Sequence, residues 1–382
     1  MFAFTTPVVP HARVGTRSSV SITRPQHLGI AVARRSRISV SQNFPEQKSS
    51  NVSTIKMVAR EEPSSINPSS GLSLPSSDTL QVGFLFFLWY VFNIIFNLMN
   101  KTVLNAWSKP WILSTVQLGV GSIMVLTQWA LRLQKRPNLS FKLIRALFLP
   151  TISHLVGHVS TCISFSYVAV SFSHIVKACE PAFGALGSAL VLGEVYSPGV
   201  YATLLPIISG VALSAVTQFQ FSWPGFLFAM LSNLAFASRN IFSKLTMGEF
   251  KKDPTLSPQN IYGIMSVMAF MIEVPIALSV EGLSALPSSH IARVLAGSGV
   301  FYTLYNTVSF MALGKTGVVT HAVGNILKRA SVIVVSIFFF RTPVKLFNAV
   351  GMGIALAGTF LYSIVKQRFL AKKKAEAEAK SA

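Results

Sequence analysis

The sequence predicts an all-α membrane protein, a bundle of ten transmembrane helices built from two related halves. Hydrophobic residues make up 51% of the 382 residues, and charged residues make up only 12%. A soluble domain carries roughly 25% charged residues, about twice this fraction. From Leu80 onward apolar stretches follow one another, and each has the ~20 residues that cross the hydrocarbon core as a helix. These observations exclude an ordinary cytosolic enzyme and a disordered protein.

The N-terminal residues 1–57 have the composition of an organellar transit peptide, rich in Arg and Ser and nearly free of acids. Their longest apolar run, residues 28–33, is too short for the core of a secretory signal, which argues against the ER route. Composition alone does not separate a plastid from a mitochondrial peptide, and a plain disordered basic tail is the alternative. Residues 58–79 are rich in Pro and Ser, so we expect a disordered linker.

The ten apolar stretches form a predicted ten-helix domain over residues 80–366, and a basic tail follows at 367–382. Pro150 lies inside the third stretch, so a kink is expected there. The stretches fall at 80–102, 111–133, 143–169, 172–193, 198–218, 223–245, 259–280, 291–313, 318–340 and 344–366.

Basic residues are distributed unevenly between the two sides of this bundle. The net charge is +21, which in a soluble protein would suggest nucleic acid, but no nucleic-acid-binding motif is present. We expect no nucleic-acid partner, and contact with membrane lipids instead. The side that holds both termini would also hold the basic residues around 132–142, Lys251, Lys252 and Lys315, which the positive-inside rule assigns to the inner face. Lys101, Lys109, Arg293, Arg341 and Lys345 would lie opposite.

An internal repeat is indicated by two similar segments. His174 precedes Lys177 and a Gly-Val-Ala-Leu run at 210–213, while His321 precedes Lys328 and a Gly-Ile-Ala-Leu run at 353–356. Two related halves with charged residues near the midplane are a common plan of secondary carriers.

Four cations lie within the apolar stretches: Lys177, Lys328, Arg329 and Arg239. Each costs ~2.5–3.5 kcal/mol at the centre of a membrane helix, so each is a candidate functional residue. Glu180 follows Lys177 by one turn and is expected to offset it, whereas no acid accompanies Lys328 and Arg329. Snorkelling to the interface or internal pairing is the structural alternative. Unpaired cations predict an anionic ligand, and the Arg fork beside a Lys point charge suits phosphate.

Neutral polar and aromatic residues could complete such a site. His158, Thr161 and Phe165 recur at helical spacing and would share one face. Tyr305 could donate a hydrogen bond to a ligand, and Phe236, one turn before Arg239, could form a cavity wall. For each of these residues, packing within the bundle is the alternative. No nucleophile, metal-binding or phosphate-loop motif is present, so we expect no enzyme activity, no cofactor and no metal site.

Four segments of the sequence resemble a known family. The segments VGHVSTCISFSYVAVSFSHIVKACEPAF, MLSNLAFASRNIFSK, FYTLYN and THAVGNILKR are similar to the plastid phosphate translocators of the drug/metabolite transporter superfamily, and the likeness covers about residues 80–366. The resemblance implies the drug/metabolite transporter fold and an antiporter of the plastid inner envelope, with residues 1–57 as a plastid transit peptide. Its members exchange inorganic phosphate for phosphorylated sugars or three-carbon acids by alternating access.

The resemblance also implies roles for the candidate residues. Lys177, Lys328 and Arg329 match the family's phosphate-binding cations, while His158, Thr161, Arg239 and Tyr305 match positions that contact the phosphate or the carbon skeleton. Phe165 and Phe236 are candidates from the helical spacing alone. The residues THAVGN at 320–325 are similar to the triose-phosphate type, so triose phosphate and 3-phosphoglycerate are the expected counter-substrates.

Other features keep further substrates open. RNIFSK and FRTPVKLFNAVG look more like the hexose-phosphate and phosphoenolpyruvate types, and a pentose-phosphate translocator is a further alternative. Thr303 and Thr307 depart from the usual His and Gln, and Glu273 stands where an apolar residue is expected. A nucleotide-sugar transporter of the ER or Golgi is the less favoured rival, and an enzyme acting on a phosphorylated lipid is the weakest. The sequence leaves the oligomeric state open.

Overall fold

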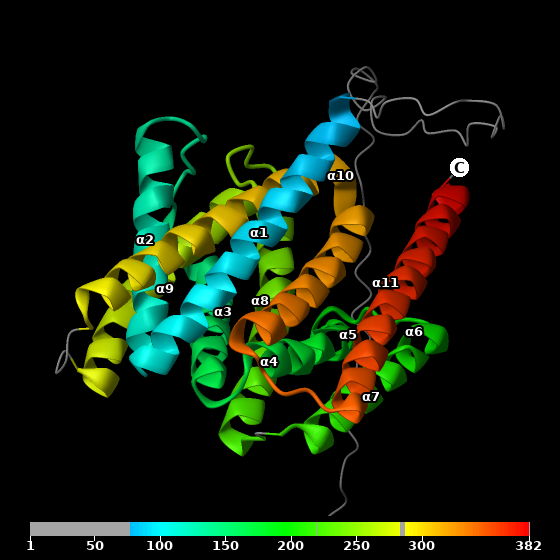
Figure 1. The fold of residues 1–382 in the computed structure, drawn as a ribbon. Helices are drawn as coiled ribbons and strands as arrows, with labels where there is room; N and C mark the ends of the chain where they lie inside the picture. The colour runs from blue at the N-terminus through cyan, green and yellow to red at the C-terminus, as the bar shows by residue number, and fades with distance from the viewer. Residues whose placement is uncertain (1–76, 220, 283–286, 382) are drawn as a thin grey trace, which may run out of the picture. The chain divides into compact units, whose positions relative to one another are not determined.

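The computed structural model describes residues 77–219, 221–282 and 287–381, and within these residues every regular element is a helix. The predicted transit peptide lies outside the described residues, and so does the predicted linker except for its last three residues, which begin the first helix. Eleven α-helices follow in order (Figure 1): α1 Ser77–Ala106, α2 Pro110–Ala130, α3 Phe141–Tyr167, α4 Val170–Val176, α5 Glu180–Gly187, α6 Pro198–Ala202, α7 Leu204–Thr217, α8 Trp223–Glu249, α9 Pro258–Glu281, α10 Ser289–Phe340 and α11 Leu346–Ser381.

One predicted span is broken into short helical pieces. Between α4 and α5 lies a 3₁₀ turn, Lys177–Cys179, and a π turn, Ser188–Leu192, ends the segment. The cause is Pro181, which has no N–H to bond the carbonyl of Lys177 and so interrupts the α-helical ladder. Gly193 ends the segment in the left-handed region, at a φ of 66°. The break places Lys177 at a point where the backbone is irregular.

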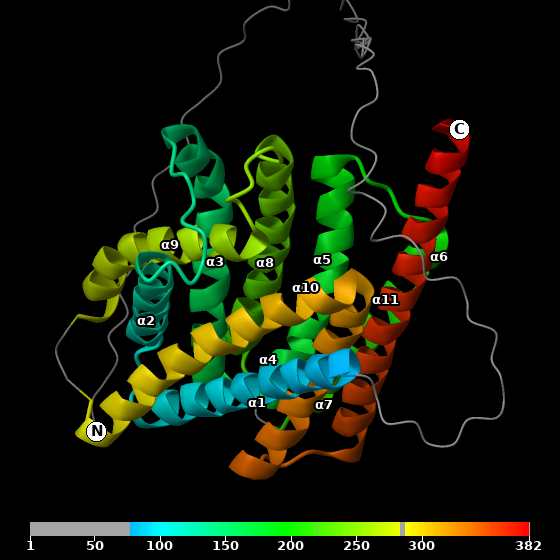
Figure 2. The ribbon, with the colours of Figure 1, turned by 90° about the horizontal axis from the view of Figure 1, so that it is seen from above.

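The predicted eighth and ninth spans belong to a single helix that folds back on itself. The side chains of Ser309 and His321 are hydrogen bonded at 3.0 Å, although twelve residues of straight helix would separate them by ~18 Å. Lys315, at the bend, donates to Gln81 at the start of α1. Figures 1 and 2 show the first limb of α10, which begins at Ser289, running beside α1, and the second limb, Thr320–Phe340, returning from it. The bend lies between Ser309 and His321, so helical backbone replaces the loop that the sequence suggested.

Ten membrane-crossing segments result when α4 to the π turn count as one, α6 and α7 as one, and the limbs of α10 as two. Eight described helices are long and apolar enough to cross a membrane by length and composition alone. The first limb of α10 and α8 fall short of that measure because they carry polar residues such as Arg239, Asn240, Asn306 and Ser309. The predicted fold class, an all-α bundle of ten spans, is confirmed.

The connections gather at two opposite ends of the bundle. At one end, Asn138 contacts Thr255 and Lys142 pairs with Glu249, so the α2–α3 and α8–α9 loops lie together. At the other end, the carboxylate of Glu281 accepts the first free N–H groups of α2, from Trp111 and Ile112, at 3.0 and 2.9 Å. This grouping matches the two sides that the Lys and Arg count predicted; which compartment each side faces stays a prediction.

Helix pairing follows the pattern of two related halves. The α1 helix packs along the first limb of α10, as α3 packs along α8, and the pairs α2–α9 and α7–α11 each join one half to the other. In the last pair the backbones touch: a Cβ on Gly210 would lie 2.4 Å from the nitrogen of Ala355. Small residues at such positions let membrane helices approach closely.

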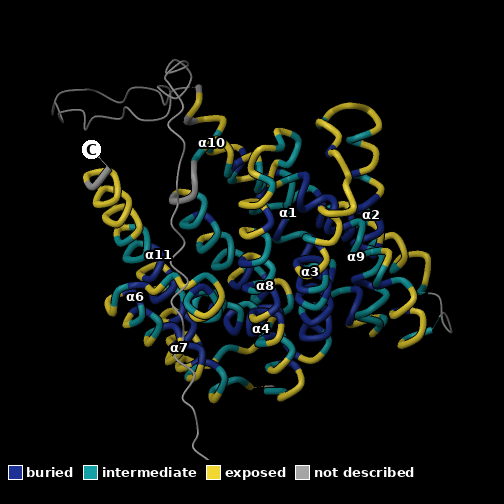
Figure 3. Tube along the Cα trace, turned by 180° about the vertical axis from the view of Figure 1, so that it is seen from behind, coloured by how far each residue is buried: buried dark blue, intermediate teal, exposed yellow. Residues whose placement is uncertain are grey.

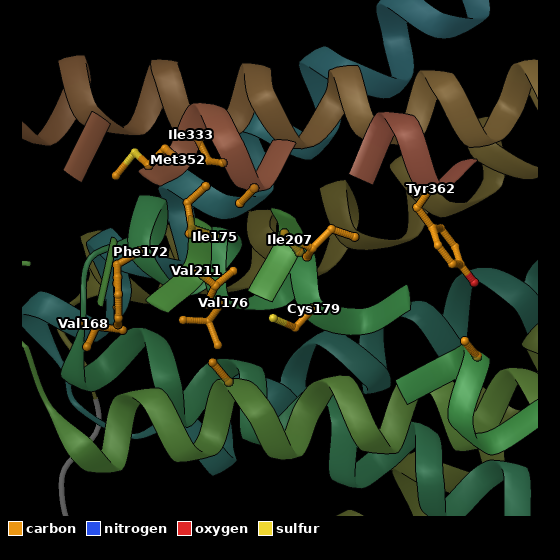
Figure 4. Close-up of a cluster of buried hydrophobic side chains, with 14 of the residues drawn as sticks. Val168, Phe172, Ile175, Val176, Cys179, Ile207, Val211, Ile333, Met352 and Tyr362 are labelled. Carbon is orange, nitrogen blue, oxygen red and sulfur yellow. The ribbon is translucent and has the colours of Figure 1, made fainter. Parts of the chain in front are cut away.

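The broken segment is held by the largest buried cluster of apolar side chains. Phe172, Ile175 and Val176 of α4 pack with Ile207 of α7 and Ile333 of α10, as Figure 4 shows. Buried residues concentrate along α3, α4 and α8 in the middle of the bundle (Figure 3). Since α4 is clamped by apolar contacts, the polar turn that follows it has a fixed position.

Candidate functional site

A cavity of about 400 Å³ lies at the centre of the bundle, between α1, α3, the broken segment, α8, α9 and both limbs of α10. Nine residues were predicted as site residues from the sequence, and eight of them line this cavity: Lys177, Lys328, Arg329, His158, Thr161, Arg239, Tyr305 and Phe236. The structure thus brings together side chains that lie up to 171 residues apart in the chain, between 158 and 329.

Lys177 projects from the 3₁₀ turn onto the polar face of α3. Its ammonium group donates to the hydroxyl of Thr161 at 2.8 Å, and that hydroxyl donates in turn to the carbonyl of Gly157 at 2.8 Å. The ammonium also lies 4.7 Å from the centroid of the Phe236 ring. These neutral contacts orient the cation without cancelling its charge.

Lys328 and Arg329 project from the second limb of α10. The Lys328 ammonium lies 5.0 Å from the Trp89 ring and 6.0 Å from the Tyr305 ring, both aromatic faces that attract a cation. Arg329 donates from Nη2 to the Glu180 carboxylate at 3.3 Å, and its buried Nη1 has no hydrogen-bond partner. A guanidinium with one bonded and one unbonded nitrogen can still donate to an oxyanion.

The pairing of Glu180 corrects the sequence prediction. Glu180 was expected to offset Lys177 one turn earlier, and Arg329 was expected to have no acid, but the ion pair joins Glu180 to Arg329 instead. The i,i+3 spacing brings side chains together on a regular helix, and the 3₁₀ turn and Pro181 interrupt that regularity here. Consequently Lys177 has no ion-pair partner within 4.0 Å among the described residues.

Arg239 is fixed by its neighbours on the other wall. It donates to the amide oxygen of Asn240 at 2.8 Å, contacts Nδ1 of His154 at 3.3 Å, and stacks over Phe236 with its guanidinium carbon 4.9 Å from the ring centroid. Because Nδ1 of His154 accepts from Arg239, the histidine proton lies on Nε2, which faces the hydroxyl of Tyr302 at 3.3 Å. Because Lys177 also contacts the Phe236 ring, Phe236 is held between Lys177 and Arg239.

His158 and Phe165, predicted to share a face of α3, have different surroundings. His158 lines the cavity beside Tyr302, with ring centroids 4.7 Å apart, and its buried Nε2 has no hydrogen-bond partner. Phe165 has no exposed surface, packs with Val103 and Leu113 in an apolar cluster, and is not itself among the residues that line the cavity. Phe165 has the surroundings of a packing residue, and we leave it out of the site proposed below.

Several lining residues were not predicted from the sequence. Asn93, Asn97 and Asn100 line the cavity from α1, and their spacing of four and three residues marks one helical face that the sequence already displayed. Trp89 stacks on His321, with centroids 4.5 Å apart and an interplanar angle of 15°. Trp89 lies near the middle of the first apolar stretch, where a large aromatic ring is expected to pack against other helices, so the sequence carried no signal for its role beside Lys328.

The lining reaches only one end of the bundle. Met247 and Pro258, beside the α8–α9 loop, belong to it, so the cavity extends toward the end that holds the start of α1 and the end of α11. Below its deep end, Lys101 donates to the carbonyls of Phe165 and Val168 at 2.6 and 3.1 Å and ties α1 to α3. The site is thus approached from one side.

The lining of this cavity is strongly cationic. Among the described lining residues, four cations face one carboxylate, Glu180, which leaves a net charge of +3 with neutral histidines. A ten-span bundle whose central, one-sided cavity carries this charge defines a membrane carrier for an anionic solute.

Comparison with known proteins specifies the class. Residues 80–363 match the model of the Triose-phosphate Transporter family, and the chain belongs to this family of transporters, not of enzymes. It is 39% identical to glucose-6-phosphate/phosphate translocator 1 of Arabidopsis thaliana, over 94% of this chain and 91% of that protein. It is 43% identical to the xylulose 5-phosphate/phosphate translocator of the same plant, over 78% and 72%, and 42% identical to a triose phosphate/phosphate translocator of Brassica oleracea var. botrytis, over 75% and 73%.

Proposed function

We propose that this protein exchanges inorganic phosphate for phosphorylated three-carbon compounds, triose phosphate and 3-phosphoglycerate, across the plastid inner envelope. The observation that carries the proposal is the convergence of Lys177, Lys328 and Arg329 on one cavity with Glu180 as its single carboxylate among the described lining residues. The proposed location follows from the predicted transit peptide and from relatives that are described as chloroplastic.

The three cations supply the donors that a phosphate group requires. Arg329 has an unbonded nitrogen, Lys328 lies against the Trp89 and Tyr305 rings, and Lys177 has donors to spare beyond Thr161. A phosphate dianion with its acceptor oxygens can accept from all three, which a monocarboxylate with two oxygens cannot do as fully. We assign His158 of α3 and Tyr305 of the first limb of α10, which are neutral and line the same cavity, to the carbon skeleton.

Obligatory exchange follows from the charge of the empty cavity. Two unit charges 4 Å apart interact with roughly 4 kcal/mol at an effective dielectric near 20. Closing the cavity without an anion would bury several mutually repelling cations, so the empty carrier should reorient slowly. A bound phosphate compound removes most of this repulsion and permits the crossing in either direction.

A hexose or pentose phosphate is the second candidate counter-substrate. Besides the three asparagines of α1, Asn240, Asn306 and Asn325 line the cavity, and amides pair well with sugar hydroxyls because each is both donor and acceptor. Relatives named for glucose 6-phosphate and xylulose 5-phosphate are as similar to this chain as the relative named for triose phosphate.

The test is uptake of labelled phosphate into liposomes that contain the purified protein. Liposomes are preloaded in turn with phosphate, triose phosphate, 3-phosphoglycerate, phosphoenolpyruvate, glucose 6-phosphate, xylulose 5-phosphate, a nucleotide sugar or buffer. We expect fast uptake against phosphate and three-carbon compounds and at least tenfold slower uptake into buffer-loaded liposomes. Equal uptake into buffer-loaded liposomes would contradict obligatory exchange, and phosphate uptake only into liposomes loaded with the nucleotide sugar would favour the nucleotide-sugar transporter.

A further inference from the structure

A second cavity, which the proposed exchange does not use, lies beside the central one. It has a volume of about 590 Å³ and is bounded by α5, the end of α8, the second limb of α10 and the middle of α11. We call it the α11 groove, because six of its lining residues belong to that helix: Thr359, Tyr362, Ser363, Lys366, Gln367 and Leu370. Glu180 and Arg329 line both cavities, so their ion pair belongs to the wall that the two cavities share.

The charges along the α11 groove leave one cation without an acid. Arg329 pairs with Glu180 at 3.3 Å. Lys244 pairs with Glu194 at 2.6 Å. Lys366 has no ion-pair partner within 4.0 Å among the described residues. The described lining of the groove therefore carries a net charge of +1, whereas that of the central cavity carries +3.

Two tyrosines position the Lys366 ammonium. It lies 4.7 Å from the centroid of the Tyr196 ring and 5.3 Å from that of Tyr362, and such aromatic contacts attract a cation without cancelling its charge. The buried hydroxyl of Tyr362 has no hydrogen-bond partner, and Figure 4 shows it turned away from the apolar cluster. The ammonium and this hydroxyl can donate to one oxyanion. Tyrosine and lysine near the end of a membrane span are also typical of the level of lipid headgroups.

The remainder of the α11 groove is largely apolar and adjoins the lipid-facing surface. Ile241 and Ile326 line it, and Gly184 leaves space, since a Cβ there would meet no atom within 4 Å. On two of the helical segments that bound the groove, Leu190 and Leu327 are 77% and 53% exposed. Exposed leucines on a membrane bundle face lipid tails, so the groove is accessible from within the bilayer.

We propose that the α11 groove binds one anionic phospholipid from the leaflet on the side of the α8–α9 loop. The phosphodiester accepts hydrogen bonds from Lys366 and from the Tyr362 hydroxyl, and an acyl chain lies along Ile241 and Ile326. Basic pockets between membrane helices bind anionic headgroups in this way. Charge separates the lipid from the cargo: a phosphodiester carries one negative charge and matches the +1 groove, whereas phosphate dianions match the +3 cavity. The bound lipid also covers the side of the Glu180–Arg329 pair that faces away from the central cavity.

The experiment is native mass spectrometry of the full chain, purified in detergent, freed of lipid and mixed with phosphatidylglycerol or with phosphatidylcholine of the same acyl chains. We expect one phosphatidylglycerol per chain to remain bound at collision energies that remove phosphatidylcholine. Lys366→Met keeps the aliphatic stem but removes the charge, and it should lower the retained phosphatidylglycerol by about fivefold. Lys366→Arg should retain it. Gly184→Leu fills the apolar part without a change of charge and should lower the retention as well.

Controls separate a specific lipid from general attraction to a basic helix. Lys372→Met removes a charge from a side chain of α11 that is 79% exposed and should retain lipid like the unchanged protein. Elution in detergent and thermal unfolding without lipid check that each variant is folded. Equal retention of the two lipids, or full retention of phosphatidylglycerol by Lys366→Met, would overturn the proposal. Displacement of phosphatidylglycerol by millimolar inorganic phosphate, with no effect of Gly184→Leu, would show a site for free phosphate and overturn it too.

Discussion

The two halves of the bundle present their cations in different ways. In the first half, Lys177 lies on a 3₁₀ turn between two short helices and contacts neutral groups among the described residues, the Thr161 hydroxyl and the Phe236 ring. In the second half, Lys328 and Arg329 lie on an uninterrupted helical limb, and Arg329 forms an ion pair with Glu180 of the first half. The first half thus presents a cation without an ion-pair partner among the described residues, whereas in the second half the Arg329 guanidinium is already bonded to the Glu180 carboxylate.

This difference suggests how one anion could connect the halves. Glu180 and a phosphate group would compete for Arg329, while no carboxylate among the described residues forms an ion pair with Lys177. Binding would then draw Arg329 toward the ligand and away from its acid. The halves would be joined by Glu180 in the empty state and by the anion in the loaded state.

The largest expected effect is common to both halves. Replacing Lys177, Lys328 or Arg329 by Ala removes a donor and a charge from a site of low dielectric, so each variant should lose exchange by at least about 100-fold, which is ~2.7 kcal/mol. Phosphate–phosphate exchange in liposomes measures the loss, and the elution profile in detergent checks that the variant is folded. Full activity of any one variant would remove that residue from the site.

The second prediction tests the fork of Arg329 against the point charge of Lys328. In Arg329→Lys the charge is kept but bidentate geometry is lost, and we expect about tenfold slower exchange. Lys328→Arg, the matched reverse change, should be better tolerated, because an Arg can also stack on Trp89. Initial rates at several phosphate concentrations measure both variants. Equal losses would mean that only charge matters at these two positions.

The sequence predicted the site residues where they lie on regular helices, and it failed where a helix is broken or where other helices cover a residue. The cations, His158, Thr161 and Tyr305 were found because charge and polarity are conspicuous within apolar stretches. The Glu180 pairing was missed because helical spacing does not hold across the break at Pro181. Phe165 was included because His158 and Phe165 share a helical face at ideal spacing, while the packing of α4 and the first limb of α10 covers the end of α3. Tertiary contacts of that kind leave no pattern within one segment.

The third prediction concerns the neutral residues that face both halves. His158→Asn and Tyr305→Phe should alter the ranking of counter-substrates by about threefold to tenfold and leave phosphate–phosphate exchange within twofold. The reason is that neither side chain carries a charge for phosphate, whereas each offers hydrogen-bonding groups at the cavity wall. Competition between labelled phosphate and each sugar phosphate provides the measurement. A uniform loss for all substrates would place both residues on the phosphate group instead.

The smallest expected effect comes from the hydroxyl that orients Lys177. Thr161 accepts a hydrogen bond from the ammonium at 2.8 Å and donates one to the carbonyl of Gly157, so its hydroxyl fixes the direction of a flexible side chain but adds no charge. Thr161→Val, which keeps the shape, should raise the phosphate KM by about threefold to fivefold, since a hydrogen bond to a charged group contributes ~1.5 kcal/mol or less when the donor can find another partner. The bound anion is such a partner, which is why the loss should be far below that of Lys177→Ala. Thr161→Ser restores the hydroxyl and should restore the KM. If Thr161→Val were as inactive as Lys177→Ala, Lys177 would need its hydrogen bond to Thr161 to bind the anion. The two halves would then differ by that hydrogen bond and not by the missing acid beside Lys177.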